Sequence, residues 1–257
     1  MKTTAYKSIS KNAMSLAAFV FTLITGSADA QNSYKIKTRV LTETVSKMTR
    51  FEVKEEQLSE FKKTLSGYVS SALASKSNIM AEAFYDQNQS NVLWLIERWN
   101  DKNQLKNFSK GKQAESLQSL NEKLLKNVPK TYYLKDLEPL TKEQWRTTAK
   151  KEDKQLVIML FVDAKNGTQQ NFKDTYHTAM PQFRSEPGVV TYQLSEIEGD
   201  DTQFVTYEKF RSQDAFQYHL SFPPIKPVIE FLETSIKNPP FQNGLHNLIE
   251  FAPLTRE

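Results

Sequence analysis

The sequence predicts an α+β fold: two ferredoxin-like βαββαβ units, packed sheet to sheet within one chain so that they close a shared barrel. One observation is an internal repeat. The stretches "NVLWLIERWNDKNQLKNF" (91–108) and "QFVTYEKFRSQDAFQYH" (203–219) each have a glutamate, an aromatic residue two places later and then a helix-start signal, 111 residues apart. The other is a strand in the first copy that is apolar on both faces, so both sides of its sheet need cover.

The repeat extends in both directions along the chain. The stretch 51–65 parallels 160–176, because each has a strand end, a polar turn and an amphipathic helix. The stretch 134–140 parallels 248–254, and both end in Pro-Leu. The polar segment between the copies is typical of a linker or a surface helix. We therefore expect four parts: a signal peptide at 1–30, a first repeat at 31–140, a linker at 141–154 and a second repeat at 155–257.

Each copy has the order strand, helix, strand, strand, helix, strand. In the second copy, "QLVIMLFV" (155–162) is a continuous β-rich run. The next segment, 167–184, carries apolar residues at helical spacing along one face. Pro181 lies within this helix, which is therefore expected to be kinked or to end early.

The rest of the second copy supplies the remaining elements. "EPG" (186–188) predicts a turn, and "VVTYQLSEI" with "TQFVTYEKF" predicts a hairpin across residues 198–201. A helical region broken by prolines, 213–236, leads to the last strand at 245–251. In the first copy, the corresponding first helix has an apolar face formed by Leu58, Phe61, Leu65, Tyr68 and Val69.

The third strand of the first copy predicts how the two units pack. Its alternate residues are apolar on one face and almost entirely apolar on the other: Val92, Trp94 and Ile96 against Leu93, Leu95, Glu97 and Trp99. Helices can cover only one face of such a unit, so we expect the second copy to cover the other.

The first thirty residues have the pattern of a secretory signal. Three lysines precede the apolar stretch "MSLAAFVFTLI" (14–24), and "ADA" (28–30) is an A-x-A cleavage site. The apolar stretch is too short for a permanent bilayer-spanning helix, although an uncleaved anchor is the alternative. We expect cleavage after Ala30, a secreted or periplasmic protein, and no stable membrane insertion afterwards.

The composition narrows the chemistry. Removal of three lysines and one aspartate with the signal would lower the formal net charge from +4 to +2, which does not predict a nucleic-acid partner. The absence of cysteine excludes disulfides and thiolate ligation of metals. The seven glycines form no phosphate-binding loop, and His177, His219 and His246 are too scattered to predict a metal site. We therefore expect neither a metal nor another cofactor.

Three stretches of the second copy form an ordered pattern: "EPGVVTYQL" (186–194), "FVTYEKF" (204–210) and "DAFQYH" (214–219). They give E-P-G, a tyrosine four residues after the glycine, E-x-aromatic, and a histidine eleven residues after that glutamate. Through them the chain resembles a tandem member of the antibiotic biosynthesis monooxygenase domain family, in the dimeric α+β barrel superfamily. In the first copy "KSNIMAEAF" stands in place of E-P-G and the tyrosine, and Phe108 in place of the histidine. The resemblance implies that a family-type site lies in the second copy.

The candidate site residues lie on the hairpin and helices of the second copy. His219 is the candidate base, Glu208 a carboxylate that would be desolvated, and Tyr192 a donor to a substrate oxygen. Each also has a structural interpretation: a core histidine, a hydrogen-bonded buried glutamate, and a cross-strand packing tyrosine. Glu97, in the copy without the histidine, favours the structural interpretation of the glutamate. The aromatic residues expected to contact the substrate are Tyr176, Phe183, Phe204 and Phe210.

The resemblance implies a cofactor-independent monooxygenase that acts with dioxygen on a small aromatic quinol or phenol. A deprotonated substrate of this kind can itself reduce dioxygen, if the protein supplies a dry pocket, a base and hydrogen bonds. Two alternatives stay open. One is a barrel that binds a small ligand without chemistry; the other is haem binding or degradation, with His219 as axial ligand. The pseudo-dimer could also associate further into a homo-oligomer.

Overall fold

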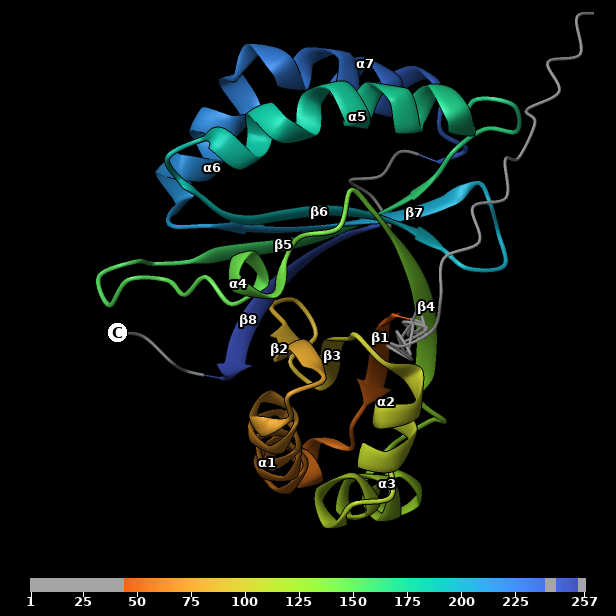
Figure 1. Ribbon diagram of the computed structural model, residues 1–257, viewed down its shortest axis with the longest axis vertical. Helices are drawn as coiled ribbons and strands as arrows, with labels where there is room; N and C mark the ends of the chain where they lie inside the picture. Colours follow the sequence, from red (N-terminus) through yellow and green to blue (C-terminus); the bar gives the residue numbers. More distant parts are fainter. Residues whose placement is uncertain (1–43, 239–243, 254–257) are drawn as a thin grey trace, which may run out of the picture. The chain divides into compact units, whose positions relative to one another are not determined.

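The computed structural model describes residues 44–238 and 244–253 (Figure 1). The expected signal peptide and its cleavage site lie outside these residues. Within the described ranges, no helix has both the length and the apolar character needed to cross a bilayer. The first repeat consists of β1 (Val45–Glu52), a 3-10 turn η1 (Glu55–Gln57), α1 (Leu58–Ala74), β2 (Asn78–Asp86), β3 (Val92–Trp99), α2 (Lys102–Phe108), α3 (Lys112–Leu124) and β4 (Lys130–Leu137).

The second repeat follows the short helix α4 (Lys142–Trp145). It contains β5 (Leu156–Asp163), α5 (Gln169–Ser185), β6 (Val189–Ile197), β7 (Gln203–Phe210), α6 (Gln213–Ser221), the 3-10 turn η2 (Pro223–Ile225), α7 (Lys226–Thr234) and β8 (Leu245–Ala252). The two lists confirm the expected βαββαβ order in each repeat.

The two repeats keep a constant spacing over their first four main elements. The starts of β1 and β5, α1 and α5, β2 and β6, and β3 and β7 are each 111 residues apart, and the spacing grows to 115 only between β4 and β8. A residue of the first repeat can therefore be compared with its counterpart in the second by adding 111, up to the end of β3.

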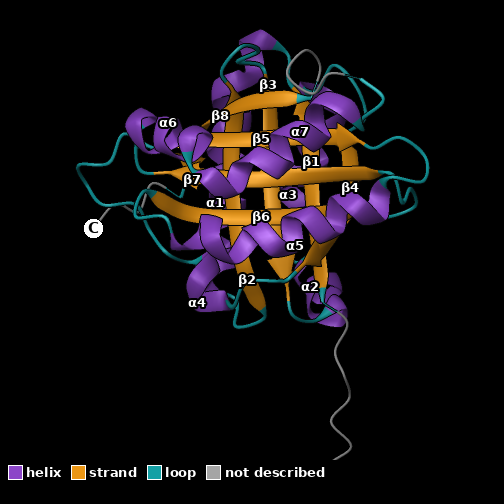
Figure 2. Ribbon diagram, turned by 90° about the horizontal axis from the view of Figure 1, so that it is seen from above, coloured by secondary structure: helices purple, strands orange, loops and turns teal. Residues whose placement is uncertain are grey.

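The eight strands form one closed barrel in the order β1-β3-β2-β8-β5-β7-β6-β4, and β4 pairs with β1 to complete the ring. Within each repeat the last strand lies beside the first. The two sheets meet at β2–β8 and at β4–β6, where all pairing is antiparallel. Figure 2 shows the strands of one sheet running across those of the other. This confirms two ferredoxin-like units packed sheet to sheet as an intrachain barrel.

Three apolar cores result from this arrangement. One lies between the β5–β7–β6 sheet and the helices α5 and α7, a second lies between the first sheet and α1 and α3, and a third fills the barrel. Figure 1 shows the two helical layers on opposite outer sides. All residues of β3 are buried: Val92, Trp94 and Ile96 belong to the barrel core, and Leu93, Leu95 and Trp99 to the helix-side core. The prediction of two apolar faces is confirmed.

One detail differs from the expectation. Helix α5 runs through Pro181 to Ser185 and does not end early. Proline removes one backbone hydrogen bond from a helix interior. Here Met180 and Phe183, on either side of Pro181, are both buried in the helix-side core, so tertiary packing holds the helix together.

Candidate functional site

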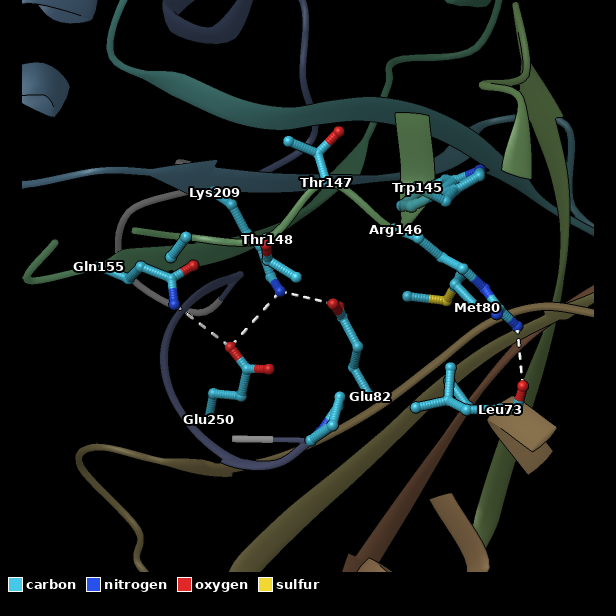
Figure 3. A pocket seen from close by; sticks show the side chains of 13 residues that line it. Leu73, Met80, Glu82, Trp145, Arg146, Thr147, Thr148, Gln155, Lys209 and Glu250 are labelled. Carbon is cyan, nitrogen blue, oxygen red and sulfur yellow. Dashed lines mark hydrogen bonds and ion pairs between the residues drawn. The ribbon is translucent and has the colours of Figure 1, made fainter. Parts of the chain in front are cut away.

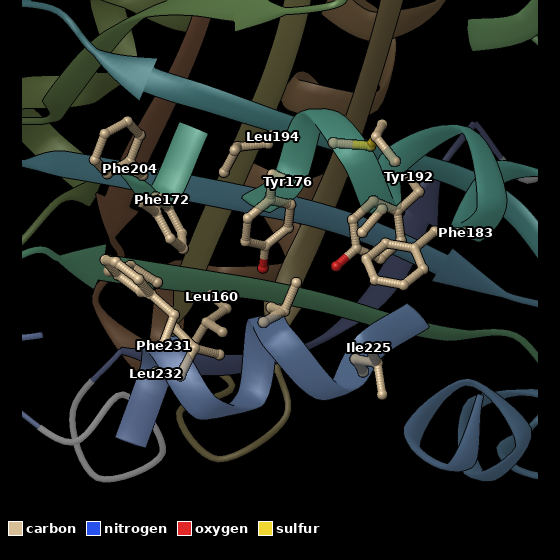
Figure 4. Close-up of a cluster of buried hydrophobic side chains, with 14 of the residues drawn as sticks. Leu160, Phe172, Tyr176, Phe183, Tyr192, Leu194, Phe204, Ile225, Phe231 and Leu232 are labelled. Atoms are coloured by element: carbon tan, nitrogen blue, oxygen red, sulfur yellow. The ribbon is translucent and has the colours of Figure 1, made fainter. Parts of the chain in front are cut away.

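The residues predicted for the site all lie on the helix-facing side of the second sheet. The alternation along β7 turns Phe204, Thr206, Glu208 and Phe210 toward α5 and α7. Figure 4 shows Tyr176 and Phe183 of α5 above Tyr192 and Phe204 of the sheet. All seven predicted residues are buried: Tyr176, Phe183, Tyr192, Phe204, Glu208, Phe210 and His219.

His219 lies at the C-terminal end of α6. The helix begins at Ser212, whose side chain accepts a hydrogen bond from the Ala215 amide. The imidazole is 1% exposed and packs against the rings of Phe183, Tyr192 and Phe210, with centroids 4.7, 5.4 and 5.2 Å away. Burial lowers the pKa of His219 to about 4. At neutral pH the ring is therefore uncharged and able to accept a proton.

The turn that precedes β6 brings a second titratable group to the imidazole. The Oε1 atom of Glu186 lies 2.8 Å from Nδ1 of His219. Burial, and then the charge of Glu208, raises the pKa of Glu186 to about 7. Its Oε2 atom has no hydrogen-bond partner. Gly188 allows α6 to come this close, since a Cβ at that position would lie 2.3 Å from the Cβ of Ala215.

Glu186 was missed as a site residue, because E-P-G predicted only a turn. The available signal was the motif itself, in which a carboxylate occurs together with the histidine. The first repeat has Ser75 at the position of Glu186 and Phe108 at that of His219. Phe108 packs on Trp99 at 4.8 Å, much as His219 packs on Phe210. The two members of the pair are thus present together in one repeat and absent together from the other.

Glu208 lies beside this pair with hydroxyl groups around it. Thr206 Oγ1 donates to its Oε1 atom at 2.7 Å, and the Tyr192 phenol hydrogen-bonds to it as well. Burial raises the pKa of Glu208 to about 7, and the hydrogen bonds only partly oppose this. Burial and Glu208 also hold the pKa of Tyr176 and Tyr192 far above the usual value, so both phenols remain donors. The cluster can hold or pass a proton near neutral pH.

Two cavities border the helices of this cluster. One of about 190 Å³ is lined by Arg184 and Tyr192, and one of about 440 Å³ lies between α5 and the prolines of η2. His219, considered as a haem ligand, has its Nδ1 on Glu186 and three aromatic rings around it. Among the residues that the structure describes, no group of three or more histidines and carboxylates could hold a metal ion.

Another cavity, of about 300 Å³, opens where β2 and β8 meet (Figure 3). Lys209 donates to Glu82 at 2.6 Å and lies 3.5 Å from Glu250. Burial opposes its charge, but the two carboxylates raise the pKa of Lys209 above its usual value. It is therefore a fixed ammonium group and not a nucleophile. Arg146 lines the same cavity but donates to the carbonyls of Leu73, Asn78 and Ile79.

A fourth cavity, of about 520 Å³, lies in the first repeat between the sheet and the helices α2 and α3. It is lined by Glu97, the counterpart of Glu208. The four cavities just described are not lined by Glu208 or His219, so the two repeats differ: one has a proton-exchanging cluster in a packed core, and the other has space.

Comparison with known proteins places both repeats in one family. The model of the family described as antibiotic biosynthesis monooxygenase matches residues 44–119 and 155–230. These stretches make up more than half of the chain, and one falls in each repeat. An uncharacterized protein of Synechocystis is 28% identical over 78 residues, which cover 30% of this chain and 53% of that protein. The match thus spans about half the length of this relative.

Solved structures show the same fold over both repeats. A candidate monooxygenase of Lactobacillus acidophilus has a TM-score of 0.67 at 16% identity, with 80% of this chain and 93% of that chain covered. One of Fusobacterium nucleatum has a TM-score of 0.68 at 14% identity, covering 81% and 93%. An anthrone oxidase-like protein has a TM-score of 0.53 at 9% identity, covering 80% and 91%. At these identities the likeness shows a shared fold.

Proposed function

Because the chain belongs to the antibiotic biosynthesis monooxygenase family, we propose that its second repeat oxidises a small aromatic quinol or phenol with dioxygen, without a resident cofactor. The observation that carries the proposal is the 2.8 Å contact between Glu186 and His219. Residues from two separate motifs form it, and the first repeat lacks both.

The imidazole is the base in this proposal. With its Nδ1–H donating to Glu186, the neutral ring keeps a lone pair on Nε2 that can take the proton of a phenol. The phenolate that forms is electron-rich enough to reduce dioxygen. Tyr192 and Glu208 lie beside the ring: the phenol donates a hydrogen bond to the anion, and the carboxyl group, with its pKa of about 7, exchanges the released proton.

Substrate entry requires movement, because the rings of Phe183 and Phe210 are fully buried. The cavities beside Tyr192 and between α5 and η2 both border residues of α5. We propose that the substrate enters by displacing part of this packing, so that Tyr176, Phe183, Phe204 and Phe210 come to line its binding site.

The test is oxygen consumption with a panel of hydroquinones and naphthols. His219→Asn is expected to lower turnover about a hundredfold or more, the range for loss of a general base. Glu186→Gln should lower it less and shift the pH profile, because Glu186 only orients the ring. Phe108→Leu, at the matched position of the first repeat, should leave turnover unchanged. All variants are first shown to be folded by circular dichroism. Equal turnover of wild type and His219→Asn would remove the histidine from the mechanism.

A second candidate function is binding of a small ligand without chemistry. The cavity of about 520 Å³ in the first repeat favours it, because it offers space that needs no rearrangement. Absence of oxygen consumption over the whole panel, with a ligand still bound, would support this function in place of the first.

We also propose that the protein is exported, on the basis of the basic and apolar N-terminal stretch and the "ADA" site. Sequencing of the native N-terminus is expected to start at Gln31, and a start at Met1 would contradict it.

A further inference from the structure

The cavity of the first repeat lies apart from the pair formed by Glu186 and His219. It is bounded by the sheet edge of β1 and β4 and by the helices α2 and α3. Glu198, which follows β6 of the second repeat, lies at its rim, where its amide donates to the carbonyl of Tyr133. Both repeats are therefore needed to form it.

Side-chain size explains why the space is open here. Helix α3 turns Ala114 and Leu117 toward the cavity. In the second repeat, helix α7 instead places Phe231 against Phe172 of α5, with ring centroids 4.8 Å apart. The cavity is thus a feature of the first repeat's own residues, with the volume of a small-molecule site, typically about 300–1,000 Å³.

The polar floor of the cavity is a pre-positioned ammonium group. Glu97 is fully buried and accepts hydrogen bonds from Trp99 Nε1 at 2.7 Å and the Tyr68 hydroxyl at 3.0 Å, and its Oε1 lies 3.0 Å from Lys47 Nζ. The carboxylate is therefore occupied by its own neighbours. The Lys47 side chain keeps 19% of its surface exposed, and an ammonium group has three N–H donors, of which Glu97 needs one.

The charges around the cavity favour an anion. Three lysines line it, Lys47, Lys102 and Lys106, against the carboxylates of Glu97 and Glu198. One of these carboxylates is neutralised internally by Lys47. The remaining walls are mostly apolar and include Val45, Phe51, Leu95 and Leu105.

We propose that this cavity is a second binding site, for a small amphipathic organic anion: a carboxylate or phenolate on an apolar body. The anionic oxygen accepts a hydrogen bond from Lys47 Nζ, and the body packs between the sheet and Ala114 and Leu117 of α3. The site is independent of the proposed oxidation, because it shares no residue with the cluster of the second repeat.

The test compares two ligands of one shape on the full chain. The anion 2-naphthoate and its neutral isostere 2-naphthamide are titrated by calorimetry and followed by tryptophan fluorescence, since Trp99 donates to Glu97 at the floor. We expect one naphthoate site per chain and at least about tenfold weaker binding of the amide, as for loss of a hydrogen bond to a charged group. Ala114→Phe, which fills the cavity, should abolish binding and leave oxygen consumption unchanged.

The control is His219→Asn, which should bind naphthoate as the wild type does. Since Lys47→Met removes the counter-ion of Glu97 and weakens folding, the comparison of ligands and the Ala114→Phe variant carry the test. Equal affinity for acid and amide would overturn the assignment of an anion. Unchanged binding by Ala114→Phe, or loss of binding in folded His219→Asn, would overturn the assignment of the cavity.

Discussion

Glu97 and Glu208 occupy the same place in the two repeats and have opposite surroundings. Each lies on the third strand of its repeat, faces the helices and is buried, and the two are 111 residues apart. Directly opposite on the neighbouring strand, Glu97 has Lys47 and Glu208 has Ile158. Glu97 therefore has an ammonium group, a phenol and an indole as partners, whereas Glu208 has only hydroxyl groups.

The difference shows how one neighbouring residue decides what a buried carboxylate does. Paired with Lys47, Glu97 holds the floor of a cavity in place. Without a cation, Glu208 resists ionisation until its pKa is about 7, in the range where it can exchange a proton with its surroundings. The backbone position alone predicts neither role.

The largest effect is expected from removal of the cation. Lys47→Met leaves Glu97 buried without a counter-ion, which should lower the free energy of unfolding by about 3–5 kcal/mol. The double variant Lys47→Met with Glu97→Gln should recover part of the loss, because no charge is then left unpaired. Urea unfolding at pH 7 measures both. A loss of less than about 1 kcal/mol in the single variant would show that the pair is not needed for folding.

A smaller effect concerns Glu208 and pH. Its pKa is about 7 in the folded protein and 4.5 in an ordinary environment, so between these values the folded state binds more protons than the unfolded state. Stability therefore falls as pH rises through this range. Relative to Glu208→Gln, the wild type should lose about 2–3 kcal/mol between pH 5 and pH 8.

Urea unfolding of both proteins at pH 5, 6, 7 and 8 measures this difference. Other titrating groups, His219 among them, are common to both proteins and largely cancel. Two parallel stability curves would mean that Glu208 ionises as easily in the fold as in the unfolded chain.

The smallest effect transfers the lysine from one repeat to the other. Ile158→Lys places an ammonium group opposite Glu208, as Lys47 lies opposite Glu97. In this background the pH-dependent contribution of Glu208 should shrink by about 1–2 kcal/mol, because a nearby cation lowers the pKa of the carboxyl group. Ile158→Met, of similar shape and without charge, is the control and should keep the dependence seen in the wild type. If both substitutions leave it unchanged, the opposite strand does not control Glu208.

Much of the fold was predictable because it is recorded in local patterns. The repeated glutamate–aromatic–helix junction predicted two units, and the two apolar faces of β3 predicted that their sheets pack together, since Trp94 and Leu95 both require burial. The strands that join the sheets had no such signal. The pairing of β2 with β8 joins residues as far apart as Ala83 and Ala252 through backbone groups, which all residues share.

The candidate site was only partly predictable for a similar reason. His219 and Glu208 stood out because a titratable residue is unusual among aromatic neighbours. Glu186 did not, because its contact with His219 spans 33 residues and depends on how closely Gly188 lets α6 approach. Lys47 was also missed. Its relation to Glu97 follows from the register of β1 against β3, which the spacing of apolar residues does not specify.

The seams of the barrel have a consequence for how the molecule can vary. At β2–β8 and β4–β6, both partners belong to one covalent chain, so closure of the ring depends on the effective concentration that the tether between the halves imposes. Dilution that would separate two independent subunits leaves this ring closed. A ring of identical subunits also repeats every substitution twice, whereas a fused pair changes one half at a time. One half of this chain can thus keep an imidazole beside a carboxylate while the other keeps an open cavity.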